Sequence, residues 1–430
     1  MISRKKFLET SLFGFAGLSL ADFSNWKRDK NLNIDSVKNL TPSELAENEE
    51  FWAKVRTMFT LKDDFVLLNN GSVSPPSEFV QKIIEEEMNL ANQGPSLFMR
   101  VNQENKRESL RNNVAKWLNI SADEIAFTRN ATEGLSTIIF GLSFQKGDEV
   151  ILSQYDYPYV INAWKQREKR DGIVLKWVDF KLPFKVETLI ESYKSAFTEK
   201  TKFVQLTHVL NWNGQILPVK ELIELAHQNN SEVLLDAAHS FGCLELNIRD
   251  LKFDYLATSF HKWMNGPIGT GLLYCSSDKI SKVWPLFSSY NSFENDIRKF
   301  ETIGTHPIYT FLALNSAINC HDVIKLENKR ARFIYLAKLL IEGLKKYKEV
   351  KLLSPKNSEK VNGMISFELE NVTGFDLSEL LLKDFIIHTT FVKVGEIDGI
   401  RVSPNMFTSR SEIQTFIEAI KQIIEQINQK

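Results

Sequence analysis

Apolar residues recur along the chain in two patterns, short continuous runs and longer stretches with helical spacing. The short runs predict strands of a sheet that is covered on both faces, because such strands have no solvent side. These runs occupy residues 125–128, 149–152, 174–178, 202–206, 232–235, 255–258 and 271–274. Helical segments separate most of them, which predicts right-handed crossovers. The sequence therefore predicts an α/β fold with a mostly parallel sheet flanked by helices.

The pattern changes beyond Thr305. Long helical periodicity at 312–346 is followed by two short strand-like runs and by a closing helix at 411–428, for which Ser411 is the candidate N-cap. A chain of 430 residues is also long for one hydrophobic core. We therefore predict three regions after residue 21: an N-terminal tether and helix at 22–59, a large domain at 60–305 and a small α+β domain at 306–430.

Residues 1–21 have the pattern of an export signal. A basic segment that includes Arg4 and Lys5 precedes an apolar stretch at 12–21, which is too short to span a bilayer as a helix. The segment resembles a twin-arginine signal in which lysine replaces the second arginine. This predicts a periplasmic or otherwise exported protein without stable membrane association. The alternative is a cytoplasmic protein whose first helix is amphipathic.

Composition narrows the possible partners. The formal net charge is −1, with 25% charged and 43% hydrophobic residues, so no excess charge favours nucleic acid or an acidic membrane surface. The chain has three cysteines, Cys243, Cys275 and Cys320, and their wide spacing supports neither a disulfide framework nor a zinc site. We expect all three to be small core residues, and we expect no metal.

Two strand ends carry the candidate chemistry. Asp236 ends the apolar run 232–235, and Lys262 follows another strand and precedes three closely spaced glycines. This arrangement is typical of enzymes that use pyridoxal 5′-phosphate (PLP), in which a lysine forms an imine with the cofactor and a carboxylate binds its pyridine nitrogen. A single lysine is usually a solvated surface group, but Lys262 lies between Phe260 and Trp263.

Three further segments fit a PLP site. A strand-to-helix link at 128–134 predicts a phosphate site, because a helix start presents free N–H groups to an anion. We expect Ala131 and Thr132 to bind the phosphate through their backbone amides. The same residue types are also common in an ordinary helix cap. Asn211 is a candidate for the phenolic oxygen of the cofactor. Tyr157 is the preferred residue for stacking on the ring, with Tyr155 as the alternative.

The ordered set of motifs resembles the class V aminotransferase family of fold-type-I PLP enzymes, nearest to its isopenicillin N epimerase-like branch. The matching stretches cover residues 60 to 430 in the order that the family has them. They are residues 68–75, 128–133, 156–158, 207–218, 236–239, 259–274, 304–305 and 401–404. The resemblance implies a large PLP-binding domain, a small C-terminal domain and a homodimer with shared active sites.

The resemblance also implies a role for each matching residue. Lys262 corresponds to the imine lysine, Asp236 to the pyridinium partner and Arg401 to the arginine that binds the substrate carboxylate. His239 and Asn211 correspond to residues near the imine or the phenolic oxygen. The phosphate ligands that it implies are Thr132, Ser259 and His261, together with Thr305 from the neighbouring subunit.

The chain departs from the family pattern at three places. Tyrosines stand where relatives often have a stacking histidine, and Asn213 stands where relatives often have Thr or Ser. The segment 385–391 contains no cysteine, and none follows Cys320. Because family desulfurases need a nucleophilic thiol on the loop before the carboxylate-binding arginine, we do not expect desulfurase chemistry.

The expected activity is chemistry at the Cα of an amino acid or a related amino carboxylate. The resemblance favours an aminotransferase or an epimerase, and the alternative is a lyase that cleaves a C–S or other β or γ bond. A non-catalytic PLP-fold sensor is a further alternative, which the intact lysine and phosphate loop make less favourable. The substrate and the choice among these outcomes are not determined by the sequence.

Overall fold

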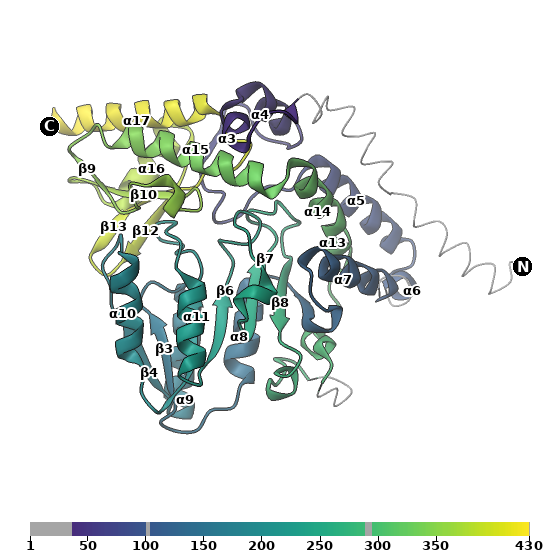
Figure 1. The fold of residues 1–430 in the computed structure, drawn as a ribbon. Helices are drawn as coiled ribbons and strands as arrows, with labels where there is room; N and C mark the ends of the chain where they lie inside the picture. The colour runs from purple at the N-terminus through teal and green to yellow at the C-terminus, as the bar shows by residue number, and fades with distance from the viewer. Residues whose placement is uncertain (1–36, 100–103, 289–294, 430) are drawn as a thin grey trace, which may run out of the picture.

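The structure, a computed structural model, describes residues 37–99, 104–288 and 295–429. A seven-stranded sheet in the order β2-β8-β7-β6-β5-β3-β4 forms its centre (Figure 1). Only β8 runs against the other strands of this sheet. The predicted α/β fold with a mostly parallel sheet is thereby confirmed. In chain order the strands are β2 (Ile125–Thr128), β3 (Glu149–Ser153), β4 (Val174–Val178), β5 (Thr201–Thr207), β6 (Glu232–Asp236), β7 (Tyr255–Ser259) and β8 (Gly271–Cys275).

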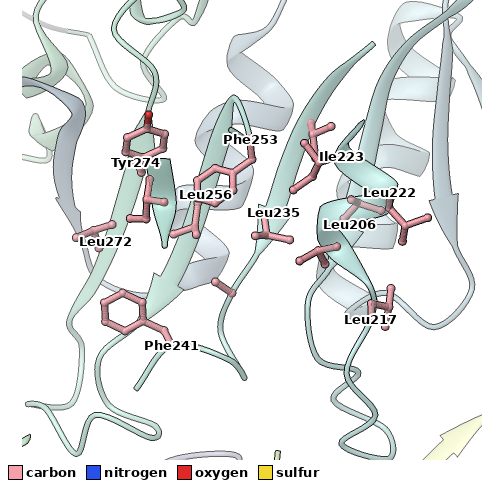
Figure 2. Close-up of a cluster of buried hydrophobic side chains, with 14 of the residues drawn as sticks. Leu206, Leu217, Leu222, Ile223, Leu235, Phe241, Phe253, Leu256, Leu272 and Tyr274 are labelled. Atoms are coloured by element: carbon pink, nitrogen blue, oxygen red, sulfur yellow. The ribbon is translucent and has the colours of Figure 1, made fainter. Parts of the chain in front are cut away.

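Both faces of the sheet are buried, which explains the continuous apolar runs. Leu235 and Leu272 belong to the core on one face, whereas their neighbours Leu234 and Leu273 belong to the core on the other. This alternation follows from the two-residue period of a strand. Figure 2 shows the first core, where side chains of a covering helix meet those of the strands. That helix is α11 (Val219–Gln228), and the opposite core includes α8 (Ala131–Gly141) and α9 (Pro158–Asp171).

A second, antiparallel sheet lies toward the C-terminus in the order β12-β13-β10-β9. Another small sheet joins distant parts of the chain, because β1 (Val66–Leu67) pairs with β11 (Ile387–His388). The predicted domain limits stay a prediction, but this pairing brings the start of the predicted large domain beside the small one. The strands of the antiparallel sheet are β9 (Val350–Leu352), β10 (Ile365–Leu369), β12 (Thr390–Val394) and β13 (Ile397–Val402).

The C-terminal helices differ from the sequence prediction in two details. The periodic stretch 312–346 forms two main helices, α14 (Leu314–Ile324) and α15 (Leu326–Leu344), because Lys325 takes a positive φ of 68° between them. The closing helix α17 (Arg410–Asn428) is capped by Ser409, whose side chain accepts a hydrogen bond from the Glu412 amide. The prediction of Ser411 as the N-cap was therefore wrong by two residues. In Figure 1, α15 and α17 lie side by side.

The N-terminal region is helical earlier than predicted. Helix α3 (Pro42–Glu47) starts after a capping box at Thr41, and α4 (Glu49–Arg56) buries Trp52 in the core. Within the predicted tether and helix at 22–59, the helical part therefore begins at Pro42. The predicted export signal at 1–21 lies outside the described residues. Within those residues, no helix combines the length and the apolar character that a membrane span requires.

The other helices complete the layers around the two sheets. They are α5 (Glu78–Asn92), α6 (Pro95–Leu97), α7 (Glu104–Leu118), α10 (Val186–Ala196), α12 (Ile248–Leu251), α13 (Tyr309–Leu312) and α16 (Gly374–Phe385), with 3-10 turns η3 (Ala122–Glu124), η4 (Ile280–Lys282), η5 (Ile297–Glu301) and η6 (Ser358–Lys360).

Candidate active site

A cavity of about 280 Å³ lies where β5, β6 and β7 end, the edge at which open α/β sheets bind ligands. Every site residue predicted from the sequence lines it except Thr305, which is exposed. The role predicted for Thr305, in a neighbouring subunit, stays a prediction. The lining residues are Gly71, Ser72, Asn130, Ala131, Thr132, Leu135, Tyr157, Thr207, Asn211, Asp236, Ala238, His239, Ser259, His261, Lys262 and Arg401.

Lys262 and Asp236 enter the cavity from neighbouring strand ends. Asp236 is the last residue of β6, is buried, and accepts a hydrogen bond from the Ala238 amide at 2.9 Å. Burial raises the pKa of Asp236 and lowers that of Lys262 to about 8. The amine is therefore partly neutral near neutral pH, as a nucleophile or base requires. Burial and the positive charge of Lys262 also lower the pKa of His239, whose Nε2 lies 3.0 Å from the Lys262 Nζ.

The start of α8 forms the anion-binding end of the cavity. Asn130 caps the helix by accepting a hydrogen bond from the Glu133 amide. Thr132, in the first turn of the helix, lines the cavity. The Ala131 amide, predicted to face the phosphate, here donates to the Ser259 hydroxyl at 2.9 Å. That bond joins β7 to the helix start. A side chain at Gly271 would meet the Asn130 backbone at 2.7 Å, so glycine at this position allows the loop to approach the sheet.

Several buried polar atoms around the cavity have no hydrogen-bond partner among the described residues. They are Asn211 Oδ1, His239 Nδ1, His261 Nδ1 and Arg401 Nε. Buried polar atoms are nearly always paired, so such a group around one cavity indicates a site built for a polar ligand. A lysine, an acid, a helix start and these unpaired donors and acceptors fit PLP: amine for the aldehyde, carboxylate for the pyridine nitrogen, and helix start for the phosphate.

Arg401 is held by contacts that the sequence did not reveal. Its guanidinium donates to the Asn211 carbonyl at 2.9 Å, to the Ser72 hydroxyl at 2.9 Å and to Asn69 Oδ1 at 3.3 Å. Burial lowers the pKa of Arg401 to about 10. The motif at 68–75 did not indicate a role for Ser72, because its partner Arg401 lies far away in the sequence. The contact exists because the parallel bridge between Asn69 and Ser403 brings these two segments together.

The two candidate stacking residues have different environments. Tyr157 lines the cavity, whereas Tyr155 packs in the core against Phe180 with 4.9 Å between ring centroids. Asp156 between them is a second buried acid, which accepts hydrogen bonds from the Thr207 hydroxyl at 2.6 Å and the Ser153 amide at 2.7 Å. Burial raises the pKa of Asp156 to about 7. Sequence reasoning gave this residue no role.

All three cysteines are buried in the cores, and none lines the cavity that the described residues form. Cys243 donates to the His239 carbonyl, and Cys320 lies 3.5 Å from the Ser77 hydroxyl. Burial raises the pKa of all three thiols, to about 12 for Cys243 and Cys320. The expectation that the cysteines are core residues is confirmed, and none is placed as a reactive thiolate.

The fold and the donor set together define a fold-type-I PLP enzyme. The family model for class-V aminotransferases matches residues 65–416, so the chain belongs to the class-V aminotransferase family and PLP is its cofactor. The resemblance inferred from the motifs is confirmed. Two relatives indicate the range of chemistry in the family. A cysteine desulfurase of Haloferax volcanii is 26% identical over 73% of this chain and 78% of its own length, and the isopenicillin N epimerase of Amycolatopsis lactamdurans is 24% identical over 86% and 98%.

Solved structures agree on the fold. The apo cysteine desulfurase of Thermococcus onnurineus NA1 superposes with a TM-score of 0.76 at 24% identity, over 86% of this chain and 98% of that one. A cystine C–S lyase in complex with its product, cysteine persulfide, gives a TM-score of 0.74 at 24% identity, over 83% and 97%. The named relatives thus include enzymes that act on C–S bonds, and they favour the lyase alternative over the aminotransferase interpretation.

Proposed function

We propose that this protein is a PLP-dependent lyase that cleaves the Cβ–S bond of a cysteine-derived amino acid without passing the sulfur to a protein thiol. The observation that carries the proposal is that all candidate PLP ligands except Thr305 line one cavity of the described residues, to which no cysteine contributes. Relatives that act on C–S bonds support the proposal that a C–S bond is cleaved. The buried cysteines support the proposal that no protein thiol accepts the sulfur.

Arg401 would bind the substrate carboxylate. Its Nε is unpaired among the described residues, and its terminal nitrogens are already oriented by Asn211 and Ser72. A guanidinium binds a carboxylate through two parallel hydrogen bonds, which fixes orientation as well as position. Such a grip determines which bond at Cα faces the cofactor and keeps the Cβ substituent inside the cavity.

Lys262 would act as the base. Its Nζ takes the proton from the substrate Cα, and His239 at 3.0 Å holds the amine in place. Asp236 would keep the pyridine nitrogen protonated, Tyr157 would stack on the ring, and Thr132, Ser259 and His261 would hold the phosphate. The bound cofactor supplies the electron sink for the Cα–H bond that breaks.

The reaction is a β-elimination that needs no oxidant. The Cα proton goes to Lys262, the electron pair forms a double bond to Cβ, and the sulfur leaves with the electrons of the Cβ–S bond. The released three-carbon fragment takes up water to give pyruvate and ammonia. With cystine as substrate the leaving group is cysteine persulfide, which diffuses away as a small molecule, because no thiol of the described cavity can receive it.

Transamination or epimerisation is the second candidate. It rests on the isopenicillin N epimerase relative, whose match extends over 86% of this chain. In transamination the same Lys262 would return the proton to the cofactor, whereas in epimerisation a donor on the opposite face would reprotonate Cα. The homodimer with Thr305 reaching the neighbouring site, and export directed by residues 1–21, are further parts of the proposal that the sequence motifs support.

Absorbance and product analysis of purified protein loaded with PLP test the proposal. Cystine and S-substituted cysteines are expected to yield pyruvate and ammonia while the visible imine band persists. A band that bleaches with an amino acid and recovers only with a keto acid would instead establish transamination. Loss of optical rotation without pyruvate would establish epimerisation. A band unchanged by every amino acid, without any product, would favour a non-catalytic protein.

A further inference from the structure

Lys329 is a buried lysine without a charged partner. It lies in α15 with 1% of its surface exposed, and its Nζ donates to the Trp263 carbonyl and lies 3.2 Å from His321 Nδ1. No carboxylate forms an ion pair with it among the described residues. Burying an ammonium group in this way costs stability. Burial accordingly lowers the pKa of Lys329 to about 7, and the position calls for a function other than stability.

The carbonyl that Lys329 holds belongs to the residue directly after Lys262. The loop around Lys262 is fixed through consecutive carbonyls, each by a different donor. The Ser74 amide donates to the His261 carbonyl at 2.9 Å and the Asn265 amide to the Lys262 carbonyl at 3.1 Å. Lys329 supplies the third donor, and it is the only one of the three that comes from a side chain.

Arg330, the next residue of α15, is linked to His239 through the segment 359–362. Arg330 donates to the Val361 carbonyl at 2.6 Å and to the Glu359 carbonyl at 2.7 Å. The next residue along that segment, Asn362, donates to the His239 carbonyl at 2.9 Å. Thus α15 contacts the backbone beside Lys262 directly and acts on the backbone at His239 only through the segment 359–362. The side chains of Lys262 and His239 lie 3.0 Å apart.

The helix itself is firmly anchored. Arg332, one turn further along, donates to the Ala46 carbonyl and to the Thr408 carbonyl, each at 2.7 Å. It is fully buried and lies over the Trp52 ring. Helix α15 can hold the Trp263 carbonyl in a defined position only if the helix itself is fixed. The contacts of Arg332 with the N-terminal helices and the C-terminal region fix it.

We propose that Lys329 is a positioning residue for Lys262, and that α15 sets the geometry of the Lys262–His239 pair by holding the backbone on both sides of it. Without the Lys329 donor the Trp263 carbonyl is buried and unpaired, and the loop rotates to find another partner. Small displacements of a reacting amine lower the rate, while the carboxylate grip of Arg401 is unaffected. The inference rests on Lys262 binding PLP and not on the choice of C–S cleavage.

Lys329→Met tests this role, with Lys338→Met as the matched control because Lys338 is exposed on the same helix. In cofactor-free protein, hydrogen exchange of residues 260–266 is expected to be faster in Lys329→Met only, because the Trp263 carbonyl loses its donor. In loaded protein, the pH midpoint of the imine band should shift and kcat should fall roughly tenfold at nearly constant KM.

Exchange, band midpoint and kcat equal to those of Lys338→Met would overturn the proposal. If Lys329→Met does not fold, Arg330→Met provides the second arm, with faster exchange around His239 and a shifted midpoint as the expected result and wild-type values as the contrary one. Wild-type protein that forms no imine band with PLP would refute the cofactor assignment itself, an outcome distinct from an unshifted midpoint. A normal band with failure to cleave C–S bonds would refute only the proposed reaction.

Discussion

Both edges of the seven-stranded sheet carry a cluster of ionisable residues, but of these two clusters only the one at the carboxyl edge has buried polar atoms without a hydrogen-bond partner among the described residues. At the amino edge, Lys279 contacts Glu232 at 2.9 Å and Asp254 at 3.3 Å, and Asp254 also contacts His227 at 3.1 Å. At the carboxyl edge, Asn211, His239, His261 and Arg401 each have a buried atom without a partner among the described residues. The ionisable residues of the first cluster pair with one another, whereas the second cluster keeps donors and acceptors for a ligand.

The difference shows that neither a cluster of charged residues nor a large cavity volume is enough to identify a ligand site in this fold. The groove at the amino edge, about 590 Å³, is larger than the site cavity of about 280 Å³. Its charged residues stabilise one another and the strand starts. Buried polar atoms that lack partners are expensive, so their concentration at one edge indicates function more directly than the size of the cavity.

The largest expected effect is that of Lys262→Ala. Removal of the amine abolishes both the imine and the proton transfer, so turnover should fall by roughly 10³-fold or more. Steady-state kinetics and the visible spectrum provide the measurement. Lys279→Ala at the amino edge is the control and should keep the band and the rate. Equal loss in both variants would contradict the distinction between the two edges.

Asp236→Asn should have the next largest effect. An amide cannot hold the pyridine nitrogen in its protonated form, so kcat should fall by roughly 10²-fold while the fold persists. The matched control is Asp254→Asn, a buried acid that directly precedes the neighbouring strand β7. If the control lost as much activity as Asp236→Asn, the carboxylate at the carboxyl edge would have no special role.

Arg401→Lys should act mainly on substrate binding. Lysine cannot reproduce the planar pair of hydrogen bonds, so KM should rise by roughly tenfold, equivalent to about 1.4 kcal/mol. Kinetics with a substrate and with its amide, which lacks the carboxylate, separate the contributions. An amide that suffers the same loss as the carboxylate would assign Arg401 a structural role.

Asp254→Asn should have the smallest effect, on stability alone. Burial opposes ionisation of Asp254, but hydrogen bonds from His227 and the Val233 amide outweigh it and lower the pKa. A carboxyl group whose folded pKa is depressed stabilises the protein above its unfolded pKa of about 3.9. The variant should therefore unfold at a lower temperature near pH 7, with a loss of about 1 kcal/mol.

As pH falls below about 4 and through the folded pKa of Asp254, this contribution disappears and the two melting temperatures should converge. Thermal unfolding monitored over that range checks the sign. A stability difference that grew toward acid would show that Asp254 is protonated in the folded protein, contrary to the paired arrangement described for the amino edge.

The sequence was sufficient for the sheet and for the centre of the site. Short continuous apolar runs between helical segments are typical of strands buried on both faces, and the last residues of parallel strands meet at one edge. Asp236 and Lys262 could therefore be placed together from the sequence alone. Chain order and strand polarity were enough.

Contacts between distant segments could not be predicted in this way. Ser72 meets Arg401, and Lys329 meets Trp263, only because of how the C-terminal part packs on the sheet. Lys325 adopts a positive φ that its residue type does not suggest, so the helix break was missed. Ser409 and Ser411 are equally suitable caps by type, and the structure forms the capping box between Ser409 and Glu412.

The most direct test of the account follows the sulfur. Holoenzyme turning over cystine would be quenched, its intact mass determined, and pyruvate and persulfide measured in the filtrate. The account predicts pyruvate with persulfide in the filtrate and a protein mass without added sulfur, because Cys243, Cys275 and Cys320 are buried away from the cavity. Sulfur bound to one of these cysteines during turnover, with activity lost when that cysteine is changed to alanine, would contradict it.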